Sequence, residues 1–244
     1  MHRFFIDKSN IIAREIELTG ENAAHAHVLR LRHGEEIVVA VCGAGVDYFC
    51  AVTKTSKTSV TAEILREKPN NAELPLEVTL FQALPKGNKM GDIIENVTEL
   101  GITRIYPVET TRCVARPTDK TARWQKIAES SAKLCHRGRI PKIHDAIDLP
   151  RAIEAANRMD AAFACYELEQ VYTLSEYFNG LDMPNVKSIG FFIGPEGGFD
   201  EREVELFKEN GIPAVTLGTR ILRAQSASVM VMANINFFIQ GMEK

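Results

Sequence analysis

Two glycine-rich turns towards the C-terminal end of the chain hold the residues whose types and spacing could do chemistry. An apolar run over residues 189–193 leads into Gly194-Pro195-Glu196-Gly197-Gly198, and a second run over residues 214–217 leads into Gly218. Glycine has no Cβ, so it adopts positive φ readily and lets the main chain approach a ligand closely. We expect the two runs to be neighbouring strands, and open α/β sheets bind ligands at the carboxyl ends of their strands. The pair predicts a ligand-binding site, although each turn alone would also suit an ordinary strand-to-helix connection.

Two common nucleotide-binding patterns do not fit these turns. A P-loop needs Gly-Lys-Ser/Thr after its glycines, whereas Gly198 is followed by Phe199-Asp200. A dinucleotide site needs Gly-x-Gly-x-x-Gly after the first strand of its sheet, and residues 84–87 (Leu-Pro-Lys-Gly) do not supply it. The sequence therefore indicates neither nucleoside triphosphate hydrolysis nor dinucleotide binding.

The composition predicts a globular protein of one or two domains. The chain has 244 residues, of which 45% are hydrophobic, enough for a substantial core. It has no apolar run long enough to span a bilayer and no apolar core of a signal peptide near its start, so we expect a cytoplasmic location. The five cysteines are scattered without a Cys-x-x-Cys pair, so no metal is expected.

Positive charge is concentrated in one segment. The whole chain has a net charge of -3, yet residues 112–142, the basic segment, contain nine Lys or Arg against two acids, a local balance of +7. Such a segment is a candidate contact surface for nucleic-acid phosphates, and the alternative is a solvated helix face. The residues that we expect to contact these phosphates are Arg112, Arg116, Arg137 and Arg139, with Arg3, Arg30 and Lys86 from outside the segment.

The pattern of elements changes at a polar linker over residues 69–75. Before the linker, short β-branched and aromatic runs predict strands at residues 4–6, 36–42, 48–53 and 59–65, with one helix at 21–31. After it, strands at 77–84, 104–108, 142–146, 161–166, 189–193 and 214–217 alternate with helices that include 89–100, 120–134 and 226–240. This alternation predicts an α/β fold with a mostly parallel sheet.

Longer blocks of sequence resemble the SPOUT (α/β-knot) methyltransferases, and within them the RsmE-type methyltransferases of small-subunit ribosomal RNA. The two most specific blocks are Ile193-Gly194-Pro195-Glu196-Gly197-Gly198-Phe199 and Leu217-Gly218-x-Arg220-Ile221-Leu222-Arg223. The supporting blocks include Arg3-Phe4-Phe5, His27-Val28-Leu29-Arg30, Lys86, Thr98-Glu99-Leu100-Gly101, Ile105-Tyr106-Pro107, Thr111-Arg112-Cys113 and Arg123-Trp124. The resemblance covers almost the whole chain.

This resemblance implies a PUA-like β-barrel that binds RNA at residues 1–70 and a deep trefoil-knotted methyltransferase domain at residues 76–244. The implied reaction is transfer of a methyl group from S-adenosylmethionine to N3 of a specific uridine in 16S rRNA. The implied partners are that rRNA, in the assembled small subunit, and a second copy of the chain. The last helix is apolar on more than one side, which gives the homodimer modest independent support.

The resemblance also assigns roles to single residues. The cofactor loop consists of Gly194, Glu196, Gly197 and Gly198; the second wall consists of Leu217, Gly218, Ile221, Leu222 and Ala227; Tyr166 and Glu167 are weaker candidates for the cofactor site. Glu196 could instead help Asp200 to cap the following helix. Three departures from the family pattern, at Asn96, Lys133-Leu134 and Gln225, concern how the substrate is positioned.

Arg223 is the candidate catalytic residue. Uracil N3 carries a proton at neutral pH, so catalysis needs orientation and stabilisation of an anionic uracil. The permanently charged guanidinium of Arg223, which follows the second wall directly, suits that task. The proton acceptor stays unassigned, because relatives carry a carboxylate where this chain has Gln225.

Two other functions are consistent with the sequence. A knotted methyltransferase could modify another atom, such as a ribose 2′-hydroxyl. A protein of the same fold could also bind RNA during ribosome assembly without catalysis, since a fold does not fix a function.

Overall fold

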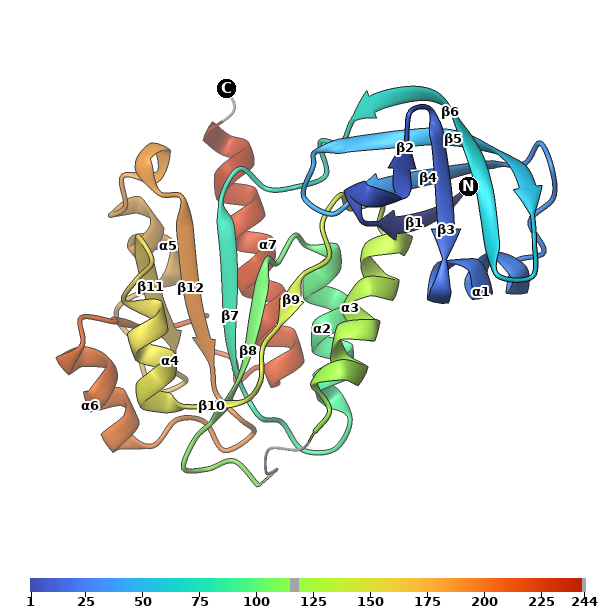
Figure 1. Ribbon diagram of the computed structural model, residues 1–244. Helices are drawn as coiled ribbons and strands as arrows, with labels where there is room; N and C mark the ends of the chain where they lie inside the picture. The colour runs from blue at the N-terminus through green and yellow to red at the C-terminus, as the bar shows by residue number, and fades with distance from the viewer. Residues whose placement is uncertain (115–118, 243–244) are drawn as a thin grey trace. The chain divides into compact units, whose positions relative to one another are not determined.

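The computed structural model describes residues 1–114 and 119–242, with side chains as far as residue 240. The chain forms two compact units, coloured along the chain in Figure 1: unit 1 comprises Met1–Glu73 and Ser130–Ile140, and unit 2 comprises Leu74–Glu129 and Pro141–Lys244. The first break lies within the segment expected as a linker. The grouping of Ser130–Ile140 with unit 1 has no counterpart in the sequence analysis. No helix among the described residues is long and apolar enough to cross a membrane.

Unit 1 is built on a curled sheet of six strands in the order β1-β4-β5-β6-β3-β2. Its strands are β1 (His2–Ile6), β2 (Ile11–Ile12), β3 (Glu15–Thr19), β4 (Glu36–Val41), β5 (Val46–Thr55) and β6 (Ser59–Pro69), with the helix α1 (Gly20–Val28) and the 3-10 turn η1 (Lys8–Asn10). Only β1 and β4 are parallel; the other neighbours are antiparallel. The sequence analysis missed β2, which has only two residues, and β3, whose two apolar residues stand between charged and polar ones.

Alternation of apolar and polar residues explains the inner face of this sheet. In β3 the buried Ile16 and Leu18 alternate with three exposed residues, which is the pattern of a strand with one face on the core. The inward residues form one cluster around Phe4, Ile37 and Val39, all of them fully buried. Burial of an aliphatic or aromatic side chain contributes about 1.5–3 kcal/mol, so this cluster is the main stabilising element of unit 1.

The segment Ser130–Ile140 packs on the other face of the sheet. Ala132 and Ile140 contact Phe5 of β1 and Ala40 of β4 in a small second core. The backbone is tied as well, because Gly43 donates a hydrogen bond to the carbonyl oxygen of Gly138 at 2.9 Å. The segment is therefore an integral part of unit 1, although the chain reaches it only after the first part of unit 2, Leu74–Glu129.

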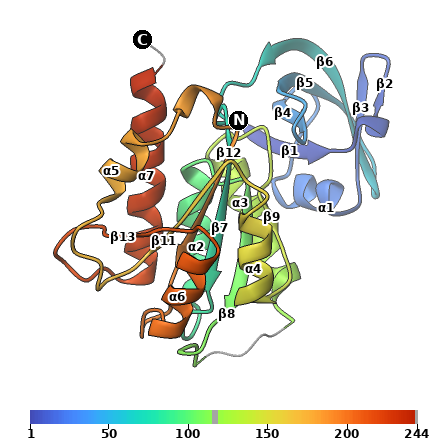
Figure 2. The same ribbon diagram turned by 90° about the vertical axis from the view of Figure 1, so that its left-hand side faces the viewer.

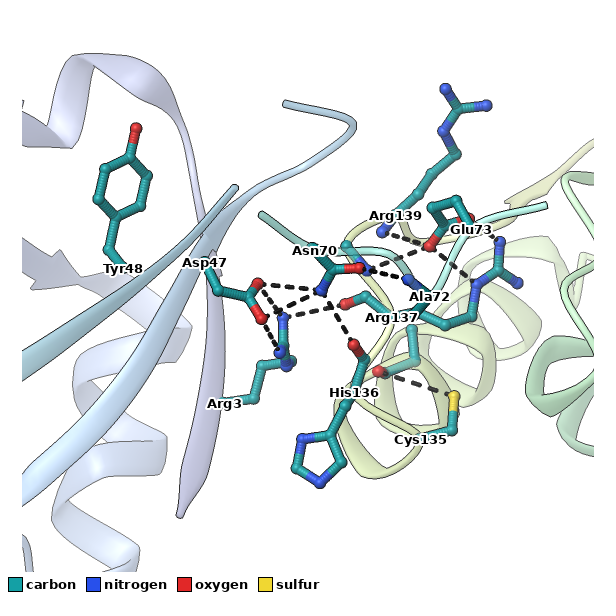
Figure 3. A network of polar contacts seen from close by, with 12 residues as sticks. Arg3, Asp47, Tyr48, Asn70, Ala72, Glu73, Cys135, His136, Arg137 and Arg139 are labelled. Carbon is teal, nitrogen blue, oxygen red and sulfur yellow. Dashed lines mark hydrogen bonds and ion pairs between the residues drawn. The ribbon is translucent and has the colours of Figure 1, made fainter. Parts of the chain in front are cut away.

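A polar network fastens the same segment to the sheet (Figure 3). The two terminal nitrogens of Arg3 donate to the two carboxylate oxygens of Asp47 at 2.7 and 2.6 Å, and Asn70 donates to the same carboxylate at 3.1 Å. Arg137 pairs with Glu73 at 2.6 Å, and the Glu73 carboxylate also accepts from the backbone N–H groups of residues 138 and 139. The buried charges of this network are thus matched one to one.

Unit 2 is a parallel sheet in the order β10-β8-β7-β12-β11-β13, with β9 added beside β8. Its strands are β7 (Glu77–Ala83), β8 (Arg104–Glu109), β9 (Lys142–Ile143), β10 (Ile147–Asp148), β11 (Ala161–Cys165), β12 (Ser188–Ile193) and β13 (Ala214–Val215). Its helices are α2 (Lys89–Glu99), α4 (Leu149–Ala156), α5 (Leu174–Asn179), α6 (Glu201–Glu209) and α7 (Ala224–Met242), with the 3-10 turn η2 (Met183–Asn185); α3 (Thr121–Leu134) begins in unit 2 and ends in unit 1. The mostly parallel sheet expected from the alternating pattern is confirmed.

Helices cover both faces of this sheet. On one face, α4 and α6 pack on a cluster that includes Phe81 of β7, Phe192 of β12 and Phe207 of α6. On the other, α2 packs along α7, and α5 lies beside α7, where the rings of Phe178 and Phe238 are 4.7 Å apart (Figure 2). Coverage of both faces explains why the central strands are apolar runs without alternation.

The strand order corrects one expectation. The two strands that precede the glycine turns, β12 and β13, are not neighbours, because β11 lies between them and pairs with both. Parallel strands are joined by helical crossovers, and a crossover can pass over a strand that is already in place. The consequence is that the carboxyl end of β11 lies between the two glycine turns.

Candidate functional site

The carboxyl ends of β11, β12 and β13 surround a cavity of about 480 Å³. All eleven residues expected to bind a cofactor line it: Tyr166, Glu167, Gly194, Glu196, Gly197, Gly198, Leu217, Gly218, Ile221, Leu222 and Ala227. Arg223 lines it as well. The structure thus brings together segments that are up to about 60 residues apart in the sequence, and Tyr166 and Glu167 lie between the two turns because β11 is the middle strand.

Tight packing explains the glycines of the first turn. A Cβ on Gly194 would lie 3.3 Å from the backbone of Gly198, so the two ends of the turn touch. Gly198 has φ of +68°, and a Cβ there would overlap the carboxylate of Glu167. Any L-residue at position 198 would therefore be strained and would also displace Glu167 from the cavity wall.

The second turn needs glycine for a different reason. Gly218 has φ of +104°, yet a Cβ added there would meet nothing within 4 Å. Its backbone N–H donates to the hydroxyl of Thr216 at 3.2 Å, which closes a small local turn. Backbone conformation, and not space, accounts for this glycine.

Glu196 ties the first turn to the start of α2. Its carboxylate accepts from Lys89 Nζ at 2.5 Å and from the backbone N–H of Lys86 at 3.2 Å. Partial burial raises the pKa of Glu196, but the hydrogen bonds from Lys89 and Lys86 outweigh it and hold the pKa below its usual range. Glu196 therefore does not cap the following helix, which was the alternative raised by the sequence.

The cap of that helix is formed by other residues. Asp200 is the N-cap of α6 and forms a reciprocal capping box with Glu203. The buried Glu203 also accepts from the backbone N–H of Thr111 at 2.7 Å. Arg112 donates to the carbonyl oxygen of Gly197 at 2.9 Å and pairs with Asp200 at 3.4 Å. The loop after β8 is thereby fixed against the glycine loop.

Arg223 lies at the entry to α7. The helix begins at Ala224, and the carbonyl oxygen of Arg223 accepts from the N–H of Ala227 at 2.8 Å. The side chain of Arg223 is exposed, and small buried residues, Ala224 and Ala227, follow it. A cation at a helix N-terminus is disfavoured by the helix dipole, so the presence of Arg223 at this position is not explained by the stability of the helix.

Lys89 is a cavity residue that the sequence analysis missed. It is the first residue of α2, where a cation is again opposed by the helix dipole. A cation at the predicted start of a helix is the signal in the sequence that could have identified it. Its ion pair with Glu196 could not have been predicted, because the two residues are 107 positions apart.

The residues expected to contact RNA fall into two groups. Lys86, Arg30 and Arg112 are exposed, and Arg139 is half-buried. Arg3 and Arg137 are 5% and 2% exposed, and their charges are matched by Asp47 and Glu73. The prediction that these two arginines offer free charge to phosphates is wrong, because both serve the internal network of unit 1. Arg116 lies outside the described residues.

Comparisons with known proteins agree with this geometry. Residues 72–236 match a family model described as an RNA methyltransferase domain, and residues 18–65 match one described as an RNA methyltransferase PUA domain. The chain is 30% identical to the ribosomal RNA small subunit methyltransferase E of Bacillus subtilis, over 97% of this chain and 96% of that one. It is 31% identical to the Synechocystis protein of the same name, over 98% of this chain and 78% of that one.

A solved structure extends the comparison to three dimensions. The ribosomal RNA small subunit methyltransferase E of Neisseria gonorrhoeae, bound to S-adenosyl methionine, is 31% identical to this chain, with a TM-score of 0.85 and coverage of 98% of both chains. Family models, near full-length relatives and the fold therefore agree, and the chain belongs to the RNA methyltransferase family whose methyltransferase domain follows a PUA domain.

Proposed function

We propose that this protein transfers a methyl group from S-adenosylmethionine to N3 of a uridine in 16S ribosomal RNA. The observation that carries the proposal is the cavity at the ends of β11, β12 and β13, which gathers every expected cofactor residue. The relative from Neisseria gonorrhoeae is bound to the same cofactor, and the relatives carry the name of a small-subunit rRNA methyltransferase. The deep trefoil knot of the family stays a prediction for this chain.

The cavity fits the cofactor in size and chemistry. Its volume of about 480 Å³ lies within the range of sites for small organic ligands. The tight turn at Gly194 and the positive φ at Gly198 and Gly218 let the main chain approach an adenine and a ribose closely. Leu217, Leu222 and Ala227 supply apolar contacts.

S-adenosylmethionine supplies an electrophilic methyl group on its sulfonium. The protein must bring the uracil nitrogen in line with that group, and it must stabilise the negative charge that the base gains when N3 loses its proton. We assign that stabilisation to Arg223, which is exposed at the cavity and forms no ion pair with a carboxylate among the described residues. Its planar donor fork suits O2 or O4 of the uracil anion.

The acceptor of the N3 proton is not Glu196. Its carboxylate is engaged by Lys89, and its pKa is held below the usual range, so it is a weak base. Gln225 is an amide and does not accept a proton at neutral pH. We therefore assign the role to water or to a phosphate of the substrate.

We also propose that the protein acts as a homodimer on the assembled small subunit. Ile221 at the cavity and Phe237 on α7 are 87% and 74% exposed, which is unusual for large apolar residues. A second copy that covers them would shield one side of the cavity from water. Lys86, Arg112, Arg139 and Arg30 are the remaining candidates for contacts with RNA phosphates.

The decisive experiment is mass spectrometry of 16S rRNA from a strain that lacks the gene. The proposal expects loss of one 3-methyluridine and its return when the wild-type gene is restored, but not when an Arg223→Ala gene is supplied. Loss of a ribose methylation instead would identify a different target atom. Intact methylation, with calorimetry showing no binding of S-adenosylmethionine, would indicate a non-catalytic role in ribosome assembly.

A further inference from the structure

Unit 1 has a hollow of its own, with a volume of about 320 Å³. None of the residues that line it belongs to the cofactor cavity. The floor of the hollow follows a row of cross-strand partners: Arg3 of β1 pairs with Val38 of β4, and Val38 pairs with Phe49 of β5. The row continues to Arg66 of β6. Directly opposed residues project from the same face of a sheet, so the four side chains share one surface.

The segment Ser130–Ile140 covers this face of the sheet, but its cover ends at this row of residues. In the next row, Phe5 and Ala40 are covered by Ala132 and Ile140 of the segment Ser130–Ile140. Phe49 is only half-buried, and no such cluster covers it among the described residues. A half-exposed aromatic ring at the edge of a covered surface offers a flat apolar face to a ligand.

Cations surround that ring. The guanidinium carbon of Arg66 lies 4.3 Å from the ring centroid of Phe49, and Nζ of Lys68 lies 5.5 Å from it. Among the residues that the structure describes, the acidic partner of Arg66 is Glu36, at 3.8 Å, and both side chains are more than 40% exposed. Such a surface pair contributes little and can be exchanged for another anion.

Arg3, one of the residues that line the hollow, has a buried donor without an acceptor among the described residues. Arg3 is 5% exposed, and its terminal nitrogens are engaged by Asp47, but its Nε has no hydrogen-bond partner among the described residues. A buried unsatisfied donor is costly, so such a group calls for an explanation. Because Asp47 already balances the charge, this N–H suits a neutral acceptor such as a base carbonyl or a 2′-hydroxyl better than a second anion. Asn70 and His136 complete the rim of the hollow (Figure 3).

We propose that this hollow binds one unpaired nucleotide of the RNA substrate. Its base stacks at Phe49, its carbonyl or its sugar accepts from Arg3 Nε, and its phosphates lie near Arg66 and Lys68. An aromatic ring flanked by cations is the arrangement by which proteins hold single-stranded nucleic acid, whereas a duplex hides its base faces. The site rests on the proposed function for the identity of the polymer, and it is separate from the cavity where the methyl group would be transferred.

The test uses the full-length protein and a fluorescent single-stranded oligouridylate of about 12 nucleotides, which spans one site of this kind. Fluorescence anisotropy at one fixed salt concentration compares the wild type with Phe49→Ala, Phe49→Tyr and Arg66→Gln. Lys57→Gln, on the exposed turn between β5 and β6, is the control for loss of one positive charge from the same unit. An RNA duplex of equal length is the control for contacts to the backbone alone.

The proposal expects Phe49→Ala to weaken binding of the single strand by about 10-fold, the loss of one stacked base. Phe49→Tyr should keep the affinity within about 2-fold, because it keeps the ring, and Arg66→Gln should weaken binding more than Lys57→Gln does. A Phe49→Ala protein with unchanged affinity would overturn the proposal. So would an equal loss of duplex binding, or an effect of Lys57→Gln as large as that of Arg66→Gln. If Phe49→Ala fails to fold, the comparison of Arg66→Gln with Lys57→Gln decides.

Two further readouts separate this site from the proposed methyl transfer. Binding of S-adenosylmethionine by calorimetry should be the same in wild type and Phe49→Ala, because unit 2 alone supplies the cofactor cavity. If the wild-type protein does not bind S-adenosylmethionine, the methyltransferase proposal is wrong. The measurement with the oligouridylate would still test the nucleotide site, because it does not depend on the cofactor. If Phe49→Ala leaves RNA affinity intact but lowers binding to purified ribosomal proteins, the surface takes a protein and the proposal is wrong.

Discussion

The arginines of the two units look alike in the sequence and do opposite things in the structure. Arg3 and Arg137 in unit 1 are buried, and each is paired with a carboxylate, so their charges belong to an internal network. Arg112 and Arg223 in unit 2 are exposed at the glycine loop and at the cavity. Local charge density in the sequence therefore does not distinguish a binding surface from an internal network; the position of the acidic partners does.

The largest expected effect is a loss of stability when the buried pair of Arg3 and Asp47 is broken. Arg3→Ala leaves the buried Asp47 with Asn70 as its remaining side-chain donor among the described residues. Removal of one partner from a buried ion pair costs about 3–5 kcal/mol of unfolding free energy. Urea denaturation of the two proteins measures this. The double variant Arg3→Met, Asp47→Leu should recover most of the loss, since a buried pair replaced by apolar residues is often neutral. A loss below about 1 kcal/mol for Arg3→Ala would mean that the pair behaves as a surface contact.

The corresponding change in unit 2 should affect rate and not stability. Arg223→Ala is expected to lower kcat about 100-fold or more, with cofactor affinity nearly unchanged, because the guanidinium stabilises the transition state. Single-turnover methylation of small subunits and calorimetry with S-adenosylmethionine measure the two quantities. Weaker cofactor binding with kcat preserved would place Arg223 in the binding wall instead.

Substitution of Gly218 is expected to have a smaller effect, and this effect distinguishes backbone strain from steric crowding. Gly218→Val is expected to weaken cofactor binding by about 1–3 kcal/mol, because a β-branched residue is strained at positive φ. Gly218→Ala should cost nearly as much, since open space surrounds the position and the strain is in the backbone. Gly211→Ala is the matched control: it has the same kind of positive φ, +74°, and open space around it, but it does not line the cavity, so cofactor affinity should not change. A folded Gly218→Val protein with wild-type affinity would place the site elsewhere.

The smallest effect is a dependence on pH. The pKa of Glu196 is lowered in the folded protein, so its ionisation stabilises the fold above the usual pKa of a glutamate, and that contribution is lost as the pH falls through the lowered value. Lys89→Met removes one of the hydrogen bonds that lower the pKa, so the loss should begin at a higher pH. Titration of the Glu196 carboxyl carbon by NMR measures the change directly. An unchanged midpoint in Lys89→Met would show that backbone donors alone set the pKa.

The sequence predicted the parallel sheet, the major helices and the cofactor residues because each depends on short-range patterns. The glycine turns at Gly194 and Gly218 follow apolar runs directly, and the periodicity of α2 and α7 is visible within the helices themselves. It predicted the order of β12 and β13 wrongly, since the strand between them is set by crossovers and not by local residues. The ion pairs of Lys89 with Glu196 and of Arg3 with Asp47 could not be predicted for the same reason, because the local sequence carries no information about a partner so far along the chain.

The segment Ser130–Ile140 has a consequence for how the protein is made. Unit 1 lacks its last part until residue 140 has been synthesised, which is 67 residues after Glu73. At about 5–20 residues per second, that interval lasts roughly 3–13 s, and further time passes before the segment leaves the ribosome. During this time the incomplete barrel exposes Phe5 and leaves Asp47 and Arg3 without the packing that buries them. Unit 1, although its translation begins first, is therefore expected to complete its folding only after the first part of unit 2, Leu74–Glu129, has been translated.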